Sequence, residues 1–442
     1  MNTRVERLSD HPARVVLEVE VEPQRVEQSV NNVYRRLARQ VRIPGFRPGK
    51  APRPVVERHV GKDTLYQEAF EELIPEAYRE AVRAADIEPV AQAKIDILEY
   101  GSGKPLRFKA EVDVKPEVKL GQYRGLKVEK RRPRVTDEAV DAFVEGIRQR
   151  HAELVEAGKP QLEKGDYAVI DYEGLIDGKP FRGGAGRGET VEVGGAAVLP
   201  EFSDQLIGMA PGDEREFEVT FPENSREDIA GKTAKFRVTL HGIKQKRLPE
   251  LDDEFAKDAG DYETLEELRA DVRRRLEEAA EEDAEAAMRQ KLLEQAVAAA
   301  EVDVPPVMVE QELARVLDEL AMSLVQNGIT VEQYLKSSGQ TEEQLAERFR
   351  DTALARVKAD LVLEAVARAE QLIPSEEEVD ARLVQLLGSA PDEKRREQFL
   401  RDEDNRRAAR NTLMRSKALD FLASHAEVTE VEFDPADEEA GE

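Results

Sequence analysis

The sequence contains no cysteine and no tryptophan, and only five of its 442 residues are histidine. Without cysteine, the chain can form no disulfide, no thiolate zinc site and no cysteine nucleophile. The histidines stand singly, and none has the i, i+4 partner of a helical metal site. They are His11, His59, His151, His241 and His425. We therefore expect neither a metal centre nor a bound cofactor.

Long apolar runs are also missing. No stretch approaches the roughly 18 consecutive apolar residues of a membrane-spanning helix, and no apolar run follows the first basic residues as it would in a signal peptide. Charged residues make up 36% of the chain. At roughly 100–200 residues per domain, the length predicts two to four domains. The sequence thus predicts a soluble, cytoplasmic, multidomain protein without a membrane partner.

Charge is distributed unevenly within the total of -27. Residues 1–115 carry a net charge of +1, residues 116–246 carry -3, and residues 247–442 carry -25. Within the first block, residues 35–62 hold nine basic side chains against one acidic side chain, Glu57. The nine are Arg35, Arg36, Arg39, Arg42, Arg47, Lys50, Arg53, Arg58 and Lys62. This basic patch should attract a polyanion while the acidic remainder is repelled; a solvated helix end with a basic bias is the alternative.

Residues 1–115 have the pattern of an α+β domain. Val15 to Val21 alternate apolar and charged residues, which predicts a strand with one buried face, and residues 94–100 and 106–114 predict two more strands. Helical spacing extends over residues 26–40 and again over 64–85. Between the helices, prolines and glycines from Pro44 to Pro54 should interrupt regular structure and form a stiff loop that carries most of the basic patch.

The rest of the chain predicts three further segments and a tail. Residues 116–150 are a linker with a short helix that Thr136 caps. Residues 151–246 alternate short strands with glycine turns, as in a compact β-rich domain. Residues 247–432 are helical by pattern, and Ser375 followed by Glu378 is typical of a capping box. Residues 433–442 form an acidic tail that we expect to be disordered.

The string GFRPGK, from Gly45 to Lys50, places an aromatic ring and two cations on the predicted loop. Phe46 could enter an apolar pocket, while Arg47 could make a bidentate pair with a carboxylate or phosphate. The string is not a nucleotide-binding P-loop, because three residues instead of four separate Gly45 from Gly49, and alanine follows the lysine. The alternative is an ordinary surface loop.

This string resembles the ribosome-docking signature GFRxGK of the bacterial trigger factor family, at the matching place between two helices of an amino-terminal domain. The resemblance implies that the loop contacts the large ribosomal subunit, both the protein beside the tunnel exit and ribosomal RNA. The implied ribosome-binding residues are Arg42, Gly45, Phe46, Arg47, Pro48, Gly49 and Lys50. The strings LPELDDEFA and VDVP in the helical region resemble the substrate-binding domain of the same family.

The β-rich domain resembles the FKBP-type prolyl isomerases in the strings VIDYEGLIDGKPFRGG, VLPEFSDQLIGMAPGDEREFEVTFP and GKTAKFRVTLHGI. In that family an apolar cup twists the X-Pro bond, whose rotation barrier is about 18–20 kcal/mol, without a nucleophile or metal. The residues implied for the cup are Tyr172, Phe181, Val198, Leu199, Phe202, Phe221 and Phe236.

Three departures from the FKBP pattern predict a more charged cup and a weakened isomerase. Arg182 replaces an aspartate, Glu201 replaces a glycine, and the flap between Pro222 and Gly231 has no tyrosine. The alternative is that the aromatics are only the core of a small barrel.

Taken together, the resemblance implies an α+β multidomain chaperone. It would bind nascent polypeptides at the tunnel exit and catalyse isomerisation of X-Pro bonds, with a weak homodimer as a state off the ribosome. Two alternatives remain open at this point. One is a dedicated prolyl isomerase with accessory recruitment domains, and the other is an RNA-binding ribosome factor, against which the acidic carboxyl-terminal half argues.

Overall fold

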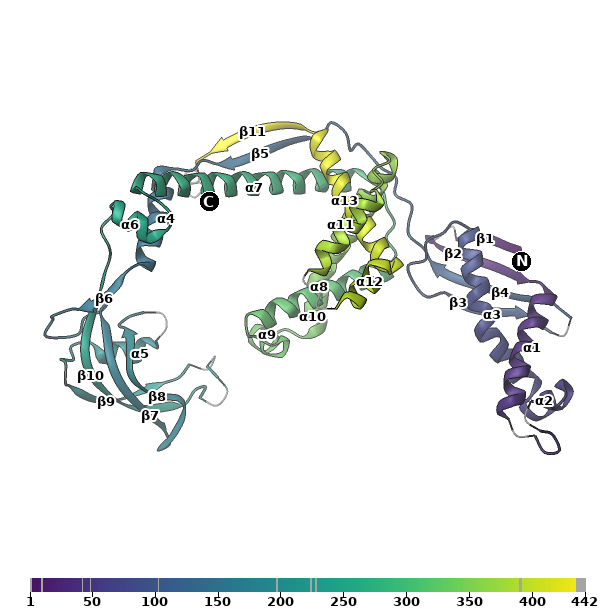
Figure 1. Cartoon of the computed structure of the whole chain (residues 1–442), viewed down its shortest axis with the longest axis horizontal. Helices are drawn as coiled ribbons and strands as arrows, with labels where there is room; N and C mark the ends of the chain where they lie inside the picture. Colours follow the sequence, from purple (N-terminus) through teal and green to yellow (C-terminus); the bar gives the residue numbers. More distant parts are fainter. Residues whose placement is uncertain are drawn as a thin grey trace. The chain divides into compact units, whose positions relative to one another are not determined.

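The computed structural model describes residues 2–8, 11–41, 43–47, 49–101, 103–195, 198–222, 225–226, 229–388 and 392–434. The chain divides into two compact units. The first is formed by residues 1–129 and 288–429, and the second by residues 130–287 and 430–442. Both units contain helices and strands (Figure 1), which agrees with the predicted α+β multidomain class.

The amino-terminal part of the first unit is a four-stranded antiparallel sheet with two long helices on one face (Figure 1). Strand order is β1-β2-β4-β3. Alternate side chains of β2 from Val15 to Val21 are buried against the helices, which confirms the predicted strand and its inward face. The elements are β1 (Asn2–Leu8), β2 (His11–Val21), α1 (Pro23–Gln40), α2 (Arg53–Val60), α3 (Lys62–Ala84), β3 (Lys94–Glu99) and β4 (Leu106–Asp113).

Helix α2 corrects the prediction that the prolines up to Pro54 interrupt regular structure. In the structure, Pro52 is the residue before the helix and Pro54 lies in its first turn. The first turn of a helix tolerates proline, since the amide hydrogens there have no partner within the helix. The interrupted segment is therefore shorter than predicted.

The remainder of the first unit is helical. Helix α10 contacts α8 and α13, and α11 contacts α13. The predicted capping box is confirmed: Ser375 Oγ accepts a hydrogen bond from the Glu378 amide at 3.2 Å, and the Ser375 amide donates to Glu378 Oε2 at 2.7 Å. The helices are α8 (Pro306–Gln326), α9 (Val331–Ser338), α10 (Glu342–Ala369), α11 (Glu376–Leu387), α12 (Glu393–Arg401) and α13 (Glu403–Ser424).

The second unit is built around a five-stranded antiparallel sheet of order β6-β10-β7-β8, with β9 also paired to β10. Strand β10 is the longest, and it pairs with β9 in its first half, with β6 at its end and with β7 over most of its length.

Thr136 caps α4 as predicted, since its Oγ1 accepts from the Ala139 amide at 3.2 Å. The elements are α4 (Asp137–Arg150), β6 (Glu153–Glu156), β7 (Tyr167–Ile176), β8 (Lys179–Glu192), α5 (Pro200–Leu206), β9 (Glu214–Thr220), β10 (Thr233–Arg247), α6 (Asp253–Ala259) and α7 (Leu265–Ala299), which continues into the first unit.

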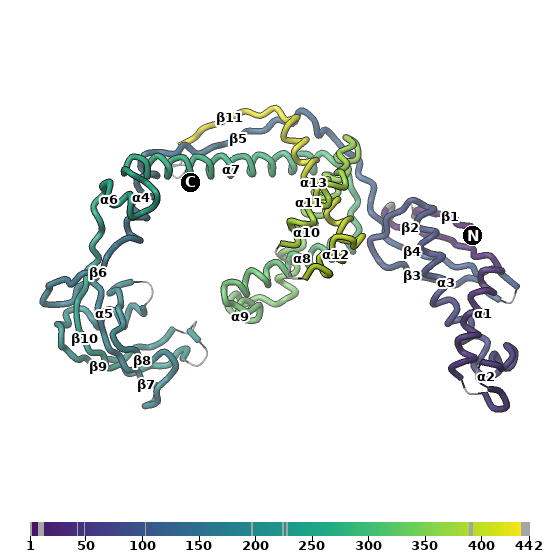
Figure 2. The backbone as a smooth tube through the Cα atoms, viewed as in Figure 1, coloured from purple at the N-terminus to yellow at the C-terminus, as the bar shows by residue number. Residues whose placement is uncertain are grey.

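Two strands that are far apart in sequence, β5 (Lys127–Pro133) and β11 (Glu427–Phe433), lie side by side (Figure 2). The Glu427 amide donates to Leu126 O, and the Arg134 amide donates to Phe433 O, both at 2.8 Å. Strand β11 corrects the prediction that this end of the chain is helical. Its alternating, β-branched sequence EVTEVEF was the signal for a strand. The acidic tail from residue 435 lies outside the described residues.

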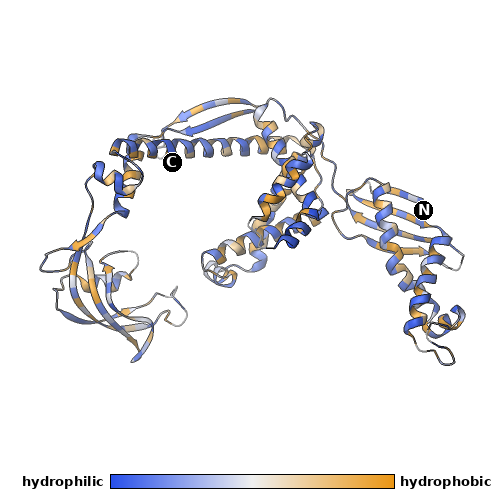
Figure 3. Cartoon of the chain, viewed as in Figure 1, coloured by the Kyte–Doolittle hydropathy of each residue, from blue (hydrophilic) through white to orange (hydrophobic). Residues whose placement is uncertain are grey.

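Hydropathy follows these elements. Hydrophobic and hydrophilic residues alternate along the strands of both large sheets, whereas α7 is mostly hydrophilic (Figure 3). Among the helices that the structure describes, none is both long enough and apolar enough to cross a membrane.

Candidate functional site

The GFRPGK loop, residues 45–50, projects from a small core that holds both of its ends. Ile43 before the loop and Ala51 after it are buried together with Ala38 of α1. The Gly49 amide donates to Ala38 O at 2.6 Å, which ties the loop to the end of α1. Gly45 adopts a φ of +87°, a conformation that favours glycine, so the chain can reverse before the exposed tip.

Phe46 and Arg47 form the exposed tip of this loop. Phe46 is 42% exposed, a large fraction for a phenylalanine. Arg47 and Lys50 are exposed too, and neither makes an ion pair with any residue that the structure describes. A ring and two cations are therefore available to a partner. Two of the predicted docking residues, Arg42 and Pro48, lie outside the described residues.

Not every cation of the predicted basic patch is available to a partner. Arg36 pairs with Glu72 and, at 3.1 Å, with Glu68, both on α3. Arg53 pairs with Glu57 at 2.6 Å and with an acidic residue of α1. These pairs pin α1, α2 and α3 together, so Arg36 and Arg53 have structural partners of their own.

The seven residues predicted for the aromatic cup line one cavity of about 540 Å³ in the second unit. They are Tyr172, Phe181, Val198, Leu199, Phe202, Phe221 and Phe236, and this set is called the aromatic cup below. Strands β7, β8 and β10 contribute three of the aromatic rings, and α5 contributes Phe202. The structure thus brings together side chains that lie more than sixty positions apart in the sequence.

Phe236 is the centre of the cup. It is 6% exposed, and its ring centroid lies 5.1 Å from that of Phe202 and 6.2 Å from that of Phe181, both nearly perpendicular to it. Tyr172 and Phe221 lie at 6.3 and 6.5 Å. Edge-to-face contacts at these distances are favourable and hold the rings in place. The floor of the cup therefore consists of packed rings, while its mouth is open to an apolar ligand.

The cavity is also lined by residues that the sequence did not single out for the cup. Val191 and Ile229 add apolar surface, and Gly183, Ser225, Arg182 and Arg226 complete the lining. Arg226 Nη2 donates to the carbonyl oxygen of Arg182 at 2.8 Å, which links the flap to β8. Glu201 does not line the cavity; its Oε2 accepts from the Thr220 amide at 3.4 Å. Of the two charged replacements noted in the sequence, only Arg182 lines the cavity.

The chemistry that this arrangement supports is conformational. An apolar cavity favours the less polar, twisted amide over the planar one, because resonance makes the planar amide the more polar form. The cavity lining that the structure describes holds no cysteine, serine–histidine pair or carboxylate that could act as a nucleophile. A cup of this kind can lower the rotation barrier of a prolyl bond without forming a covalent bond.

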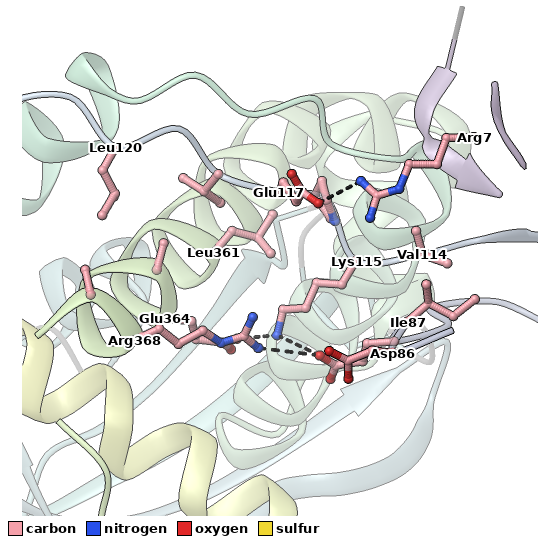
Figure 4. Close-up of a pocket in the computed structure, with 15 residues that line it drawn as sticks. Arg7, Asp86, Ile87, Val114, Lys115, Glu117, Leu120, Leu361, Glu364 and Arg368 are labelled. Carbon is pink, nitrogen blue, oxygen red and sulfur yellow. Dashed lines mark hydrogen bonds and ion pairs between the residues drawn. The ribbon is translucent and has the colours of Figure 1, made fainter. Parts of the chain in front are cut away.

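A second cavity, of about 710 Å³ in the first unit, is of a different kind (Figure 4). Its cations are already paired. Lys115 lies against Glu364 of α10 and 3.8 Å from Glu88, and Arg368 lies 3.6 Å from Glu88. Arg7 pairs with Glu117 at 2.7 Å. These ion pairs leave little free charge for a ligand, so the cavity is a structural junction.

The cup and the sheet around it define a peptidyl-prolyl isomerase domain of the FKBP type within a longer chain. Residues 158–241 match the family model of the FKBP-type peptidyl-prolyl cis-trans isomerases. Residues 1–147 match the model described as bacterial trigger factor protein, and residues 264–424 match that of the trigger factor carboxyl terminus.

Whole-length comparisons agree with these matches. The trigger factor of Desulforudis audaxviator (strain MP104C) is 44% identical over 417 residues, which cover 94% of this chain and 95% of the relative. That of Geobacillus thermodenitrificans (strain NG80-2) is 43% identical over 432 residues, covering 97% of this chain and 100% of the relative. A solved trigger factor chaperone shares the fold, with a TM-score of 0.54 at 24% identity over 95% of this chain and 99% of its own.

The chain belongs to the trigger factor family. It is accordingly a ribosome-associated chaperone that binds nascent polypeptides and carries an FKBP-type isomerase domain. This confirms the family predicted from the sequence, and it favours the chaperone over both alternatives, the dedicated isomerase and the RNA-binding factor.

Proposed function

We propose that the GFRPGK loop is the ribosome-docking element of this chain. Phe46 inserts into an apolar pocket of the protein beside the tunnel exit on the large ribosomal subunit. Arg47 pairs with a carboxylate or phosphate there, and Lys50, with Arg42 and the neighbouring backbone from Gly45 to Gly49, lies against ribosomal RNA. The observation that carries this proposal is an exposed ring beside a guanidinium that has no ion-pair partner among the described residues, on a loop whose two ends are buried.

We further propose that each domain has a separate function. Residues 1–115 bind the ribosome, residues 116–150 link this domain to the rest, residues 151–246 form the isomerase, and residues 247–432 hold nascent chain. The seven residues of the aromatic cup are the proposed catalytic residues. A cytoplasmic location follows from the ribosomal partner, and weak self-association off the ribosome remains a prediction for analytical ultracentrifugation.

The docking proposal is tested by co-sedimentation of the full-length chain with ribosomes. An aromatic anchor and a charge-assisted hydrogen bond contribute roughly 2 kcal/mol each. The double variant Phe46→Ala/Arg47→Ala, at roughly 4 kcal/mol in total, should therefore weaken binding several-hundredfold, since each 1.4 kcal/mol is tenfold. Circular dichroism should show an unchanged fold, because both side chains lie at the exposed tip.

A matched control separates docking from the loss of charge alone. Arg36→Ala also removes one positive charge from the basic patch, but its guanidinium is already paired with α3. We expect Arg36→Ala to leave pelleting nearly unchanged. If Arg36→Ala released the ribosome as strongly as Arg47→Ala, or if the double variant pelleted like the wild type, the loop would not be the docking element. Equally tight binding to naked RNA would instead support direct RNA recognition.

The isomerase proposal is tested with a protease-coupled assay on a proline peptide. Phe202 lies in the floor of the cup and is 7% exposed. Phe202→Leu keeps an apolar side chain of similar volume, so it should remain folded while losing the ring that contacts Phe236. We expect a large fall in kcat/KM with unchanged ribosome binding. If folding assistance disappeared together with isomerase activity, the dedicated isomerase would be the better description.

A further inference from the structure

Three glycines lie directly beneath aromatic rings of the cup. A Cβ atom built on Gly174 would lie well within 3.0 Å of the Phe236 ring. One built on Gly186 would lie 2.6 Å from Cε1 of Tyr172, and one built on Gly184 would lie 2.7 Å from Cε1 of Phe181. Carbon atoms that are not bonded make their best contacts at about 3.5–4.0 Å. No side chain, not even a methyl group, fits beneath these rings.

Two of these contacts are built into the register of the sheet. Phe236 of β10 is the direct cross-strand partner of Gly174 on β7, and Tyr172 of β7 is the direct partner of Gly186 on β8. Directly opposed residues in an antiparallel pair have neighbouring side-chain positions. A ring opposite a glycine can therefore lie flat on the bare backbone of the next strand.

Backbone conformation does not explain these glycines. Nearby Gly183 and Gly188 have φ values of +83° and +64°, so their turns favour glycine for conformational reasons. Gly174, Gly184 and Gly186 have no such positive φ, so a left-handed backbone is not the reason for glycine there. Glycine inside a strand also weakens the strand. The space that the rings occupy is the remaining physical reason for glycine at these three positions.

We propose that Gly174, Gly184 and Gly186 are positioning residues of the isomerase cup. Each receives the face of one ring and thereby sets how far that ring projects into the cavity. A methyl group at any of them would push its ring inward by about 1 Å to restore ordinary contact. The prolyl ring of the substrate would then meet a narrower cup. This inference depends on the proposed isomerase function of the cup.

The test uses full-length Gly174→Ala and Gly186→Ala in the proline-peptide assay. We expect kcat/KM to fall at least tenfold in each, with ribosome pelleting unchanged. Gly186 lies on β8, which stands at the end of the strand order beside β7, so its variant can fold even if Gly174→Ala does not. Gly242→Ala is the matched control, because a Cβ there meets nothing closer than Glu156 Oε2 at 3.8 Å; it should keep wild-type activity.

A double-mutant cycle separates positioning from general damage to the sheet. Phe236→Leu removes the ring that Gly174 accommodates, so Gly174→Ala should cost far less activity in that background than in the wild type. The same fold-loss in both backgrounds, or full activity of Gly174→Ala and Gly186→Ala, would overturn the inference. An inactive wild-type chain would instead contradict the isomerase function itself, which is a different outcome.

Discussion

Lys115 offers a sharp test of how the first unit is held together. Its ammonium group lies against Glu364 of α10 (Figure 4). It also lies 3.8 Å from Glu88, which precedes β3. The Lys115 side chain is 15% exposed and that of Glu364 is 8% exposed, so water screens this pair poorly. We predict that Lys115→Met, which keeps the apolar stem but removes the charge, destabilises α10 locally.

The free energy by which Lys115→Met destabilises α10 can be estimated from the charged neighbours that Glu364 keeps. A hydrogen bond to a charged group contributes about 1.5–3 kcal/mol, and breaking a buried ion pair costs up to about 5 kcal/mol. Arg415 still lies 3.4 Å from Glu364 after the substitution, so the carboxylate keeps one cation. We therefore expect about 2 kcal/mol, equivalent to a roughly 30-fold larger opening constant.

Hydrogen exchange measured by mass spectrometry suits this question, because a chain of several units does not unfold in one step. Exchange in peptides from α10 should accelerate about 30-fold in Lys115→Met. Lys119→Met is the matched control: Lys119 and Glu301 are 3.2 Å apart but 82% and 79% exposed. An exposed pair contributes about 0–1 kcal/mol. Equal acceleration in the two variants, or none in Lys115→Met, would refute the reasoning.

Three further predictions concern the cup and the helices. Arg182 at the cup should favour substrates with an acidic residue beside the proline. Arg182→Glu should reverse the preference between glutamate- and lysine-containing peptides in the isomerase assay. An unchanged preference would contradict this prediction. Ser375→Ala removes the capping box of α11 and should cost about 1 kcal/mol, read as faster hydrogen exchange at the start of that helix only. The Arg406 guanidinium, with Arg410, lowers the pKa of Glu376. The stabilising contribution of Glu376 is therefore present above the ordinary carboxyl pKa and lost as pH falls through the lowered value. The difference in Tm between wild type and Glu376→Gln should accordingly shrink as pH falls below the ordinary carboxyl pKa.

Local patterns in the sequence were sufficient for much of the fold. The alternation from Val15 to Val21 identified both a strand and its buried face, because successive side chains of a strand point to opposite sides. Ser375 and Thr136 identified helix starts, because a cap acts within three residues of itself. The GFRPGK string identified the exposed loop, and the resemblance to the FKBP family located seven of the residues that line the cavity of the cup.

Only the tertiary structure decided which of these residues have partners. Arg36 and Arg47 look alike in the sequence, yet α3 neutralises Arg36 from 32 residues away, while Arg47 stays unpaired among the described residues. The pair of Lys115 with Glu364 joins residues 249 positions apart. No local pattern predicts such contacts, because they depend on where separate elements meet.

The glycines beneath the cup also show the difference between what the sequence predicts and what the tertiary structure decides. From the sequence alone, a glycine in a strand predicts a weak point or a bulge. Only the register between β7, β8 and β10 reveals that Gly174 and Gly186 each face an aromatic ring. Composition and periodicity therefore determined which segments form helices or strands and which of their faces are buried. Contacts between distant segments decided which charges remain available for a partner and how wide the cup is, because those properties arise only when the strands and helices have packed together.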